Sequence, residues 1–335
     1  MNNNYEKLVS IIIPSRNIDY LLEECIEKIR LLYKEIKIIL ILDEINKELA
    51  NDITILKSIN PNMSAKRNLG VSYAQTKYVA FLDSDAYPIK NWLENGVDFL
   101  EKNKEYSAIT GTQFNPPTDT FTQKCLRLVR YSPLFTHKEW CIIIDKNAQE
   151  QDCDVLITSN VIMRKEDYEK INGMNENIYL AEDNEFSERM IKAGYKFRFI
   201  PSVSVFHREA TMYPFLRKIY CMSYYYANMF MKGKRIKNLK QSLFQFLPLF
   251  AVLLYIIFFI FSDYKLQLLI FPFLAIILLI KHAIDESKKL EYSHFKGFLI
   301  IFFTYCAFCA IWVIGTLMGS INFPSKSVQK CYKNY

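Results

Sequence analysis

The chain has 335 residues, 51% of them hydrophobic, and a formal net charge of +7. Residues 1–207 carry 26 Lys and Arg against 30 Asp and Glu, whereas residues 208–335 carry 16 against 5. The basic excess coincides with the most apolar part of the chain, so it indicates contact with membrane lipids and argues against a nucleic-acid partner.

The polar N-terminus, Met1–Lys7, has no apolar segment of the kind found in signal peptides. We therefore expect the N-terminal part of the chain to remain in the cytoplasm.

The first 110 residues alternate between apolar runs and amphipathic segments. Strands are predicted at residues 8–13, 36–42, 53–56, 78–82 and 107–110, and helices at 19–35, 64–75 and 91–102. Strands that alternate with helices predict an α/β fold with a doubly wound, mostly parallel sheet.

Residues 115–150 contain three prolines and no clear periodicity, which predicts a long irregular connection with a functional role. A strand is then predicted at 155–163, helices at 165–171 and 182–193, and two short strands within 197–206. Residues 213–231 combine tyrosines with Lys and Arg, a composition that fits a helix lying at a membrane surface.

Three uncharged apolar runs follow, and a transmembrane helix needs about 20 such residues. We predict membrane helices at about 243–261, 266–282 and 298–321. The middle run is short and contains Pro272, so a re-entrant middle segment with a cytoplasmic tail remains an alternative to three spans with an external tail. Basic residues that precede the first run should stay cytoplasmic: Lys232, Lys234, Arg235, Lys237 and Lys240.

These features divide the chain into four parts. We expect residues 1–210 to form the α/β domain, 211–240 an amphipathic, basic interfacial segment, 241–323 the membrane region and 324–335 a tail. The eight cysteines have no metal-like or disulfide-framework spacing, and Cys306 and Cys309 lie within an apolar run, where we expect them to serve packing.

The predicted strand at 78–82 ends in two carboxylates, Asp83 and Asp85. Ligands of open α/β sheets bind at the carboxyl ends of the strands, and two acids there can hold a divalent cation that in turn holds a diphosphate. A D-x-D sequence also caps ordinary turns, so the tripeptide alone leaves both interpretations open. The chain contains neither a G-x-G-x-x-G fingerprint nor a Walker A motif.

A second group of acids, Glu182, Asp183 and Glu185, opens the helix predicted at 182–193. They could complement the helix N-terminus, or one of them could act as a general base toward an acceptor hydroxyl. His207 follows the last predicted strand, where a metal or diphosphate contact competes with a purely structural role.

Taken together, these segments resemble a family 2 glycosyltransferase of the GT-A fold. The resemblance covers about residues 8–210 and rests on ordered motifs: Val9–Asn17, Leu40–Glu44, Met63–Gly70, Phe81–Asp85, Thr158–Arg164 with Ile171–Glu176, and Ala181–Phe186. Two segments depart from the family pattern. Leu42-Asp43-Glu44 replaces D-D-G-S, and Asn172-Gly173-Met174-Asn175 replaces G-G-F-D.

The resemblance implies a set of site residues, a cofactor, Mn²⁺ or Mg²⁺, and Asp183 as the catalytic base. The donor nucleotide would be held by Pro14, Arg16, Asp43, Glu44, Arg67, Asp83, Ser84 and Asp85. The metal would be held by Asp83 and mainly Asp85, with His207 added from its position at a strand end. The acceptor side would include Glu182, Glu185, Asn172 and Gly173.

Nothing between Phe186 and Lys240 matches the Q-x-x-R-W segment of processive synthases, which favours the addition of one sugar per acceptor. The expectation is a multi-pass cell-membrane enzyme with a cytoplasmic catalytic domain: an inverting, metal-dependent transferase that moves a sugar from a nucleotide-sugar donor to a lipid-linked or cell-surface glycan acceptor. A polyprenyl-phosphate sugar synthase and an inactive scaffold subunit of a membrane glycan-assembly complex remain alternatives.

Overall fold

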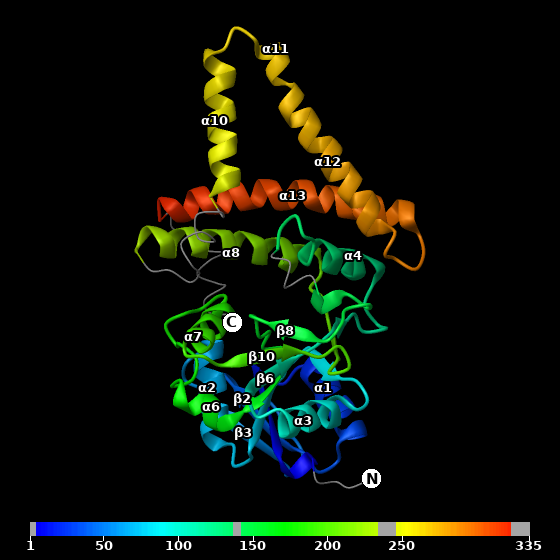
Figure 1. Ribbon diagram of the computed structural model, residues 1–335, viewed down its shortest axis with the longest axis vertical. Coiled ribbons are helices and arrows are strands. Elements are labelled where there is room, and N and C mark those ends of the chain that lie inside the picture. The colour runs from blue at the N-terminus through cyan, green and yellow to red at the C-terminus, as the bar shows by residue number, and fades with distance from the viewer. Residues whose placement is uncertain (1–4, 137–141, 234–245, 323–335) are drawn as a thin grey trace. The chain divides into compact units, whose positions relative to one another are not determined.

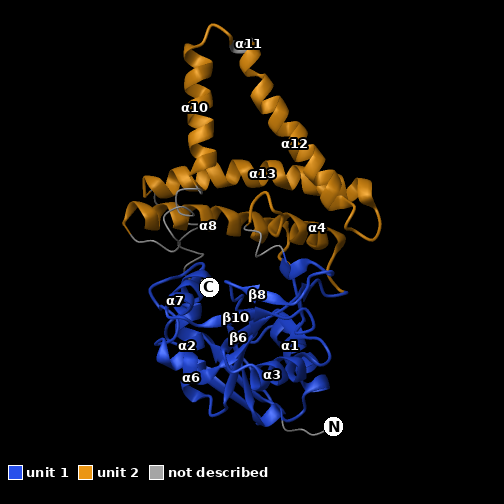
Figure 2. Ribbon diagram, viewed as in Figure 1, with its two compact units in different colours: residues 1–117, 137–208, 332–335 blue, residues 118–136, 209–331 orange. Residues whose placement is uncertain are grey.

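The computed structural model describes residues 5–136, 142–233 and 246–322. The chain forms two compact units (Figure 2). Unit 1 comprises residues 1–117 and 137–208, and unit 2 comprises residues 118–136 and 209–331.

Unit 1 is built on an eight-stranded sheet in the order β3-β2-β1-β4-β9-β6-β10-β8. Its strands are β1 (Val9–Ser15), β2 (Lys37–Leu42), β3 (Ile53–Lys57), β4 (Tyr78–Phe81), β6 (Tyr106–Thr110), β8 (Gln151–Cys153), β9 (Val161–Arg164) and β10 (Lys196–Phe199). The first four are parallel, β9 runs antiparallel to both β4 and β6, and β8 runs antiparallel to β10. The expected α/β class and mostly parallel sheet are confirmed, but the strand predicted at 155–163 is confined to β9.

Helices cover both faces of this sheet: α1 (Tyr20–Leu32), α2 (Met63–Tyr73), α3 (Trp92–Lys102), α6 (Lys165–Lys170) and α7 (Glu182–Lys192), with a short 3₁₀ helix, η1 (Tyr5–Lys7). In β1, Ile11 and Ile13 join the core that contains residues of α1 and α3, whereas Ile12 joins the core that contains residues of α2 and α7. Burial on both faces explains why the central strands read as continuous apolar runs.

A second, three-stranded sheet in unit 1 has the order β5-β11-β7. It consists of β5 (Ala86–Pro88), β7 (Gln113–Phe114) and β11 (Val205–His207). β11 pairs antiparallel with β5, so that His207 lies opposite Ala86. Because β5 begins directly after Asp85, this small sheet brings a residue from late in the chain to the end of β4.

Unit 2 is helical. It contains α4 (Phe121–Arg130), α8 (Met212–Met231), α10 (Leu247–Phe261), α11 (Lys265–Leu268), α12 (Ile270–Ser287) and α13 (His294–Ser320). The prediction that residues 115–150 are irregular was wrong for α4, whose N-terminus is fixed by a capping box between Thr120 and Gln123. A 3₁₀ helix, η2 (Ile142–Ile144), belongs to unit 1.

α13 packs closely along α8 within unit 2. An added Cβ at Gly315 would lie 2.0 Å from Ser223 Oγ, and one at Gly319 would lie 2.2 Å from the Tyr224 carbonyl oxygen. The side-chain amide of Asn228 donates to the Gly319 carbonyl at 3.2 Å. In Figure 1, α10 and α12 rise from α13 as two arms joined near α11.

Among the described residues, α13 is the one helix long and apolar enough to cross a membrane by length and composition, and α10 is a shorter apolar helix. The runs at 243–261 and 266–282 correspond largely to α10 and to α11 with α12. The basic residues Lys234, Arg235, Lys237 and Lys240 and the tail 324–335 lie outside the described residues. The three-span arrangement therefore stays a prediction.

Candidate functional site

A cavity of about 440 Å³ lies in unit 1 at the carboxyl ends of β1 and β2. The loops after these strands are tied together, because the backbone N–H groups of Asp43 and Glu44 both donate to the Arg16 carbonyl. The cavity is lined by Ser15, Arg16, Asn17, Asp19, Asp43, Glu44, Met63, Lys66 and Ser84. Its place at the ends of parallel strands is where α/β folds bind nucleotides.

Lys66 forms one wall of this cavity and is otherwise buried. Its Nζ lies 2.8 Å from Asp43 Oδ1 and donates to the Ser15 carbonyl at 2.8 Å. Burial lowers the pKa of Lys66, and Asp43 opposes that shift. The lysine thereby holds the Asp43 carboxylate in place at the end of β2.

Two carboxylates and one imidazole converge at the end of β4. Asp83, Asp85 and His207 each offer a ligand atom, and these atoms all lie within 4.8 Å of one another. His207 Nε2 is 3.4 Å from Asp85 Oδ1 and 4.0 Å from Asp83 Oδ2. The backbone N–H of Arg208 donates to the Asp85 carbonyl, which fixes the β11 end against the D-x-D segment.

Gln113 orients the imidazole. Its Oε1 lies 2.8 Å from His207 Nδ1, while its Nε2 donates to Ser159 Oγ at 2.9 Å. An amide oxygen only accepts, so in this orientation an Nδ1–H would donate to Gln113 and Nε2 would offer its lone pair on the side of the two aspartates. Carboxylate oxygens are ligands that suit Mg²⁺ and Mn²⁺, and an imidazole nitrogen beside them favours a transition-metal ion over Mg²⁺.

Arg67, on α2, is buried and bridges two acidic segments. Its guanidinium lies 3.0 Å from Asp83 Oδ1 and 2.9 Å from Glu182 Oε1. Burial lowers the pKa of Arg67, but Asp83, Glu182 and Asp183 more than offset it, so the net shift is upward. The D-x-D segment and the start of α7 are therefore joined through one buried cation.

The three acids at the start of α7 have different surroundings. Glu182 pairs with Arg67, and Glu185 pairs with Arg189 at 2.9 Å. Asp183 accepts a hydrogen bond from the Asn184 backbone N–H at 2.8 Å, and its carbonyl accepts from Ser187 Oγ. Ala181, the residue before the helix, has a positive φ of 60°. That left-handed conformation is uncommon for alanine and sets the direction in which the helix begins.

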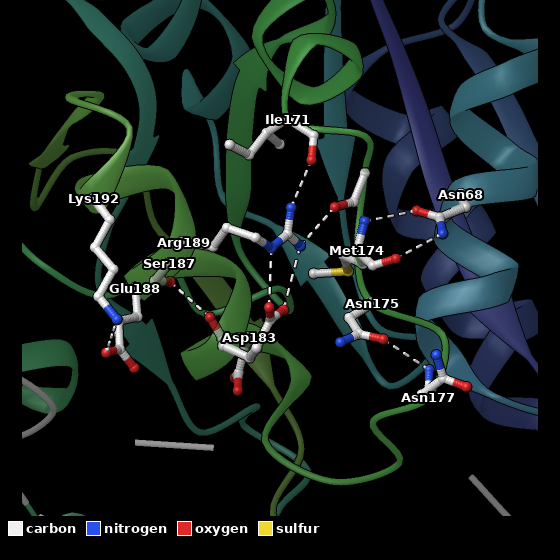
Figure 3. A network of polar contacts seen from close by, with 12 residues as sticks. Asn68, Ile171, Met174, Asn175, Asn177, Asp183, Ser187, Glu188, Arg189 and Lys192 are labelled. Atoms are coloured by element: carbon white, nitrogen blue, oxygen red, sulfur yellow. Dashed lines mark hydrogen bonds and ion pairs between the residues drawn. The ribbon is translucent and has the colours of Figure 1, made fainter. Parts of the chain in front are cut away.

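Arg189 and Asn68 fix the segment around Gly173 (Figure 3). Arg189 donates to the carbonyls of Ile171 and Gly173, and Asn68 exchanges two hydrogen bonds with the backbone of Met174. A Cβ at Gly173, which has a φ of +65°, would lie 2.5 Å from Asn68 Oδ1. This contact requires glycine for close packing, and Gly173 itself is buried, whereas Asn172 is exposed.

The structure brings seven of the fourteen sequence-predicted residues together, in two adjoining groups. Arg16, Asp43, Glu44 and Ser84 line the cavity, and Asp83, Asp85 and His207 form the acid–imidazole group. Pro14 is buried within β1, and Arg67 is buried between acids rather than in the cavity lining. Sequence reasoning missed Lys66 and Gln113, because a buried lysine and a glutamine in a two-residue strand carry no recognisable motif.

Comparison with known proteins agrees with this architecture. Residues 10–172 match the model of glycosyl transferase family 2, and residues 140–213 match a model described as the N-terminal domain of galactosyltransferase. In Bacillus subtilis, the chain is 33% identical over 115 residues to the minor teichoic acid biosynthesis protein GgaB and 32% identical over 108 residues to the uncharacterized glycosyltransferase EpsJ. These matches span 30% and 29% of this chain but only 13% and 31% of those relatives.

A solved structure extends the likeness to nearly the whole chain. The mannosyltransferase PcManGT from Pyrobaculum calidifontis, solved in complex with GDP-Man and Mn²⁺, superposes with a TM-score of 0.61 at 14% identity. The match covers 96% of this chain and 90% of PcManGT. At this identity the likeness establishes the fold. With the family match over residues 10–172, it identifies the chain as carrying a family 2 glycosyltransferase domain of the GT-A fold.

Proposed function

We propose that this protein is a membrane-anchored, metal-dependent, inverting glycosyltransferase that adds a single sugar from a nucleotide-sugar donor to a lipid-linked or cell-surface glycan acceptor. The observation that supports the proposal is that the cavity adjoins the Asp83–Asp85–His207 group. Ser84, which lies between the two aspartates in the sequence, also lines the cavity.

The donor's nucleoside fits the cavity between the β1 and β2 loops. Asp43, held by Lys66, and Glu44 present oxygens there, and such oxygens accept hydrogen bonds from a nucleobase or ribose. Arg16 supplies positive charge to the same lining. Asp83, Asp85 and His207 would hold Mn²⁺, or Mg²⁺ in its place, and the bound ion would supply the positive charge that a leaving diphosphate requires.

Asp183 is the proposed general base. The family resemblance gives this role to the aspartate of the E-D pair. The charge of Asp183 acts on the Arg67 guanidinium, while Glu182 pairs with Arg67 and Glu185 with Arg189. The Asp183 carboxylate takes the proton of the acceptor hydroxyl as its oxygen attacks the anomeric carbon. The bond from that carbon to the diphosphate oxygen breaks, so a single displacement inverts the configuration.

A cell-membrane location with a cytoplasmic catalytic domain completes the proposal. It is supported by the apolar helices of unit 2 and by the basic excess of residues 208–335. A membrane-anchored chain favours an acceptor that is itself carried by a lipid.

The test is a panel of UDP-, GDP- and dTDP-sugars incubated with the detergent-purified full chain, with Mn²⁺ or with a chelator. We expect donors of one nucleotide class to be hydrolysed or used for transfer, and only when the metal is present. Asp85→Asn should lose this activity, and Asp52→Asn should retain it. Asp52 is a matched control because it is half-exposed and pairs only at the surface, with Arg30. Equal activity of Asp85→Asn and the native protein would contradict the metal assignment, and retention of anomeric configuration would contradict inversion.

A further inference from the structure

The helix α10 exposes large apolar side chains around its whole circumference. Among its fifteen residues only Leu249 is buried, and none is charged. The exposed ones are Leu247, Phe250, Val252, Leu253, Leu254, Ile256, Ile257, Phe258, Ile260 and Phe261. A partner protein would cover one stripe of such a helix, whereas a helix that is apolar on all sides needs an apolar medium on all sides.

The first part of α12 has the same character. Ile270, Phe271, Phe273, Leu274, Ile276, Ile277 and Leu278 are all exposed. Charged residues begin at Lys281, and the buried residues of the helix, Ala283, Glu286 and Ser287, lie in its last turns. The polar part of α12 thus begins where this helix approaches α13 (Figure 1).

Helix lengths agree with insertion into hydrocarbon. At a rise of about 1.5 Å per residue, α10 is about 22 Å long and α12 about 27 Å, against a hydrocarbon thickness of about 30 Å. Between them lies a polar turn with Ser262 and Asp263. If both helices insert, they are long enough to place this turn most of the way across the hydrocarbon core.

The helix α13, in contrast, has two different faces. One face packs on α8 and α4 through residues that include Ile301, Tyr305, Phe308, Gly315 and Gly319. The opposite face exposes an apolar stripe: Phe295, Leu299, Phe303, Ile314, Leu317 and Ile321. A helix with one packed face and one apolar exposed face suits the boundary between headgroups and acyl chains.

The neighbours of α13 argue against its crossing the bilayer. α8 carries Arg217 and Lys218, and Arg130 of α4 lies 2.6 Å from Glu209 while it stacks over the Phe215 ring. A perpendicular α13 would draw these ionic groups into hydrocarbon, which is strongly unfavourable. Length and composition alone would make α13 a span, but its packing partners outweigh them.

We propose that α10, α11 and α12 form a hairpin that inserts into the bilayer from one side, and that α13 lies with α8 at the boundary between headgroups and acyl chains. The occupant of the exposed apolar surface is the lipid, not a protein partner. Two of the described helices are inserted, both ends of the hairpin lie on the same side, and the described residues contain no third span. This inference does not depend on the proposed enzymatic function.

The full chain can be reconstituted in nanodiscs of phosphatidylethanolamine and phosphatidylglycerol and labelled with two photoreactive lipids. The deep probe has a diazirine at the end of the acyl chain, and the shallow probe has it near the headgroup. We expect the deep probe to label 252–258 and 270–278 at least fivefold more than α13, and the shallow probe to label the α13 stripe. Ile59, fully exposed in unit 1, gives the background. Equal deep labelling of Phe303 and Leu254 would overturn the proposal, and so would the absence of lipid labelling on α10.

A matched pair of variants gives a second measurement. Leu254 and Phe303 are 55% and 64% exposed, so neither substitution disturbs a packed side chain. Leu254→Arg places a charge at the middle of α10, and it should raise the fraction of protein extracted by alkaline carbonate at least tenfold. Phe303→Arg should leave that fraction nearly unchanged, because a boundary arginine reaches the headgroups. Equal extraction of the two variants would contradict the different depths of α10 and α13.

Discussion

Unit 1 and unit 2 distribute apolar side chains in opposite ways. In unit 1, Ile11, Ile12 and Ile13 are fully buried, and the acids and bases gather at the ends of the strands. In unit 2, α10 turns its apolar side chains outward, while Glu209, which is paired with Arg130, is almost fully buried. Unit 1 therefore has the apolar core of a protein that folds in water, whereas α10 of unit 2 has the apolar surface of a helix in an apolar medium.

The comparison also shows two uses of an arginine that is paired with acids. Arg67 in unit 1 is buried between acids of the candidate site, whereas Arg130 in unit 2 is partly exposed and joins α4 to Glu209, just before α8. The first pairing orients carboxylates beside a cavity, and the second holds helices together. Substitutions at these and neighbouring positions should separate chemistry from packing.

The largest effect is expected for Asp183→Asn. The amide keeps the size of the side chain but cannot accept the acceptor's proton, so turnover should fall by roughly 10² to 10⁴ while donor affinity stays nearly constant. Steady-state kinetics with a donor identified in the panel, together with calorimetric donor titration, measures both quantities.

The control for this prediction is Glu188→Gln on the same helix, because Glu188 forms a surface pair with Lys192. Its turnover should match that of the native protein. An Asp183→Asn variant that keeps more than about a tenth of the native rate would move the role of base to Glu182 or Glu185.

Arg67→Met should produce the next largest effect. It leaves Asp83 and Glu182 close together without their shared cation, and loss of one partner of a buried ionic network typically costs about 3–5 kcal/mol. Equilibrium unfolding of the full chain in detergent, followed by tryptophan fluorescence, should show this loss of stability.

Arg198→Met is the matched control, since Arg198 pairs with Glu150 and Asp152 at the surface and should cost at most about 1 kcal/mol. If Arg67→Met left stability unchanged and reduced only donor affinity, Arg67 would contact the nucleotide, as the family resemblance implies, and would not act as a bridge between acids.

A smaller effect is expected in unit 2 from Gly319→Val. The added side chain would meet the Tyr224 backbone, and overpacking of this kind typically costs about 1–3 kcal/mol. Thermal unfolding in detergent should show a lower midpoint for this variant, whereas Ala310→Val, at an exposed position of the same helix, should leave the midpoint unchanged. Equal midpoints for the two variants would mean that α8 and α13 do not pack closely.

Particular residues explain how far the sequence could predict this molecule. The parallel strands and the D-x-D segment were predictable, because buried strands have continuous apolar runs and Asp83 and Asp85 directly follow one of them. α4 was missed although Thr120 and Gln123 provide a capping-box signal, because three prolines dominated the interpretation of that region.

Other features depend on tertiary pairing. β5, β7 and β11 have two or three residues each, too few for a periodic signal, yet their pairing places His207 beside Asp85 and Gln113 beside His207. The burial of Arg67 and Lys66 likewise follows from the position of α2 over the strand ends and not from any local pattern.

We infer that Asp83, Asp85 and His207 form one metal site next to the cavity proposed for the donor. Pulsed electron paramagnetic resonance of Mn²⁺ bound to the full chain in detergent, with UDP, GDP and dTDP in parallel samples, tests it most directly, because an imidazole ligand gives a ¹⁴N coupling. We expect bound Mn²⁺ with this coupling in the presence of one of the nucleotides. The coupling should be lost in His207→Gln, and the bound Mn²⁺ should be lost in Asp85→Asn. A ¹⁴N coupling that persists in His207→Gln, or Mn²⁺ binding that is unchanged in Asp85→Asn, would contradict it.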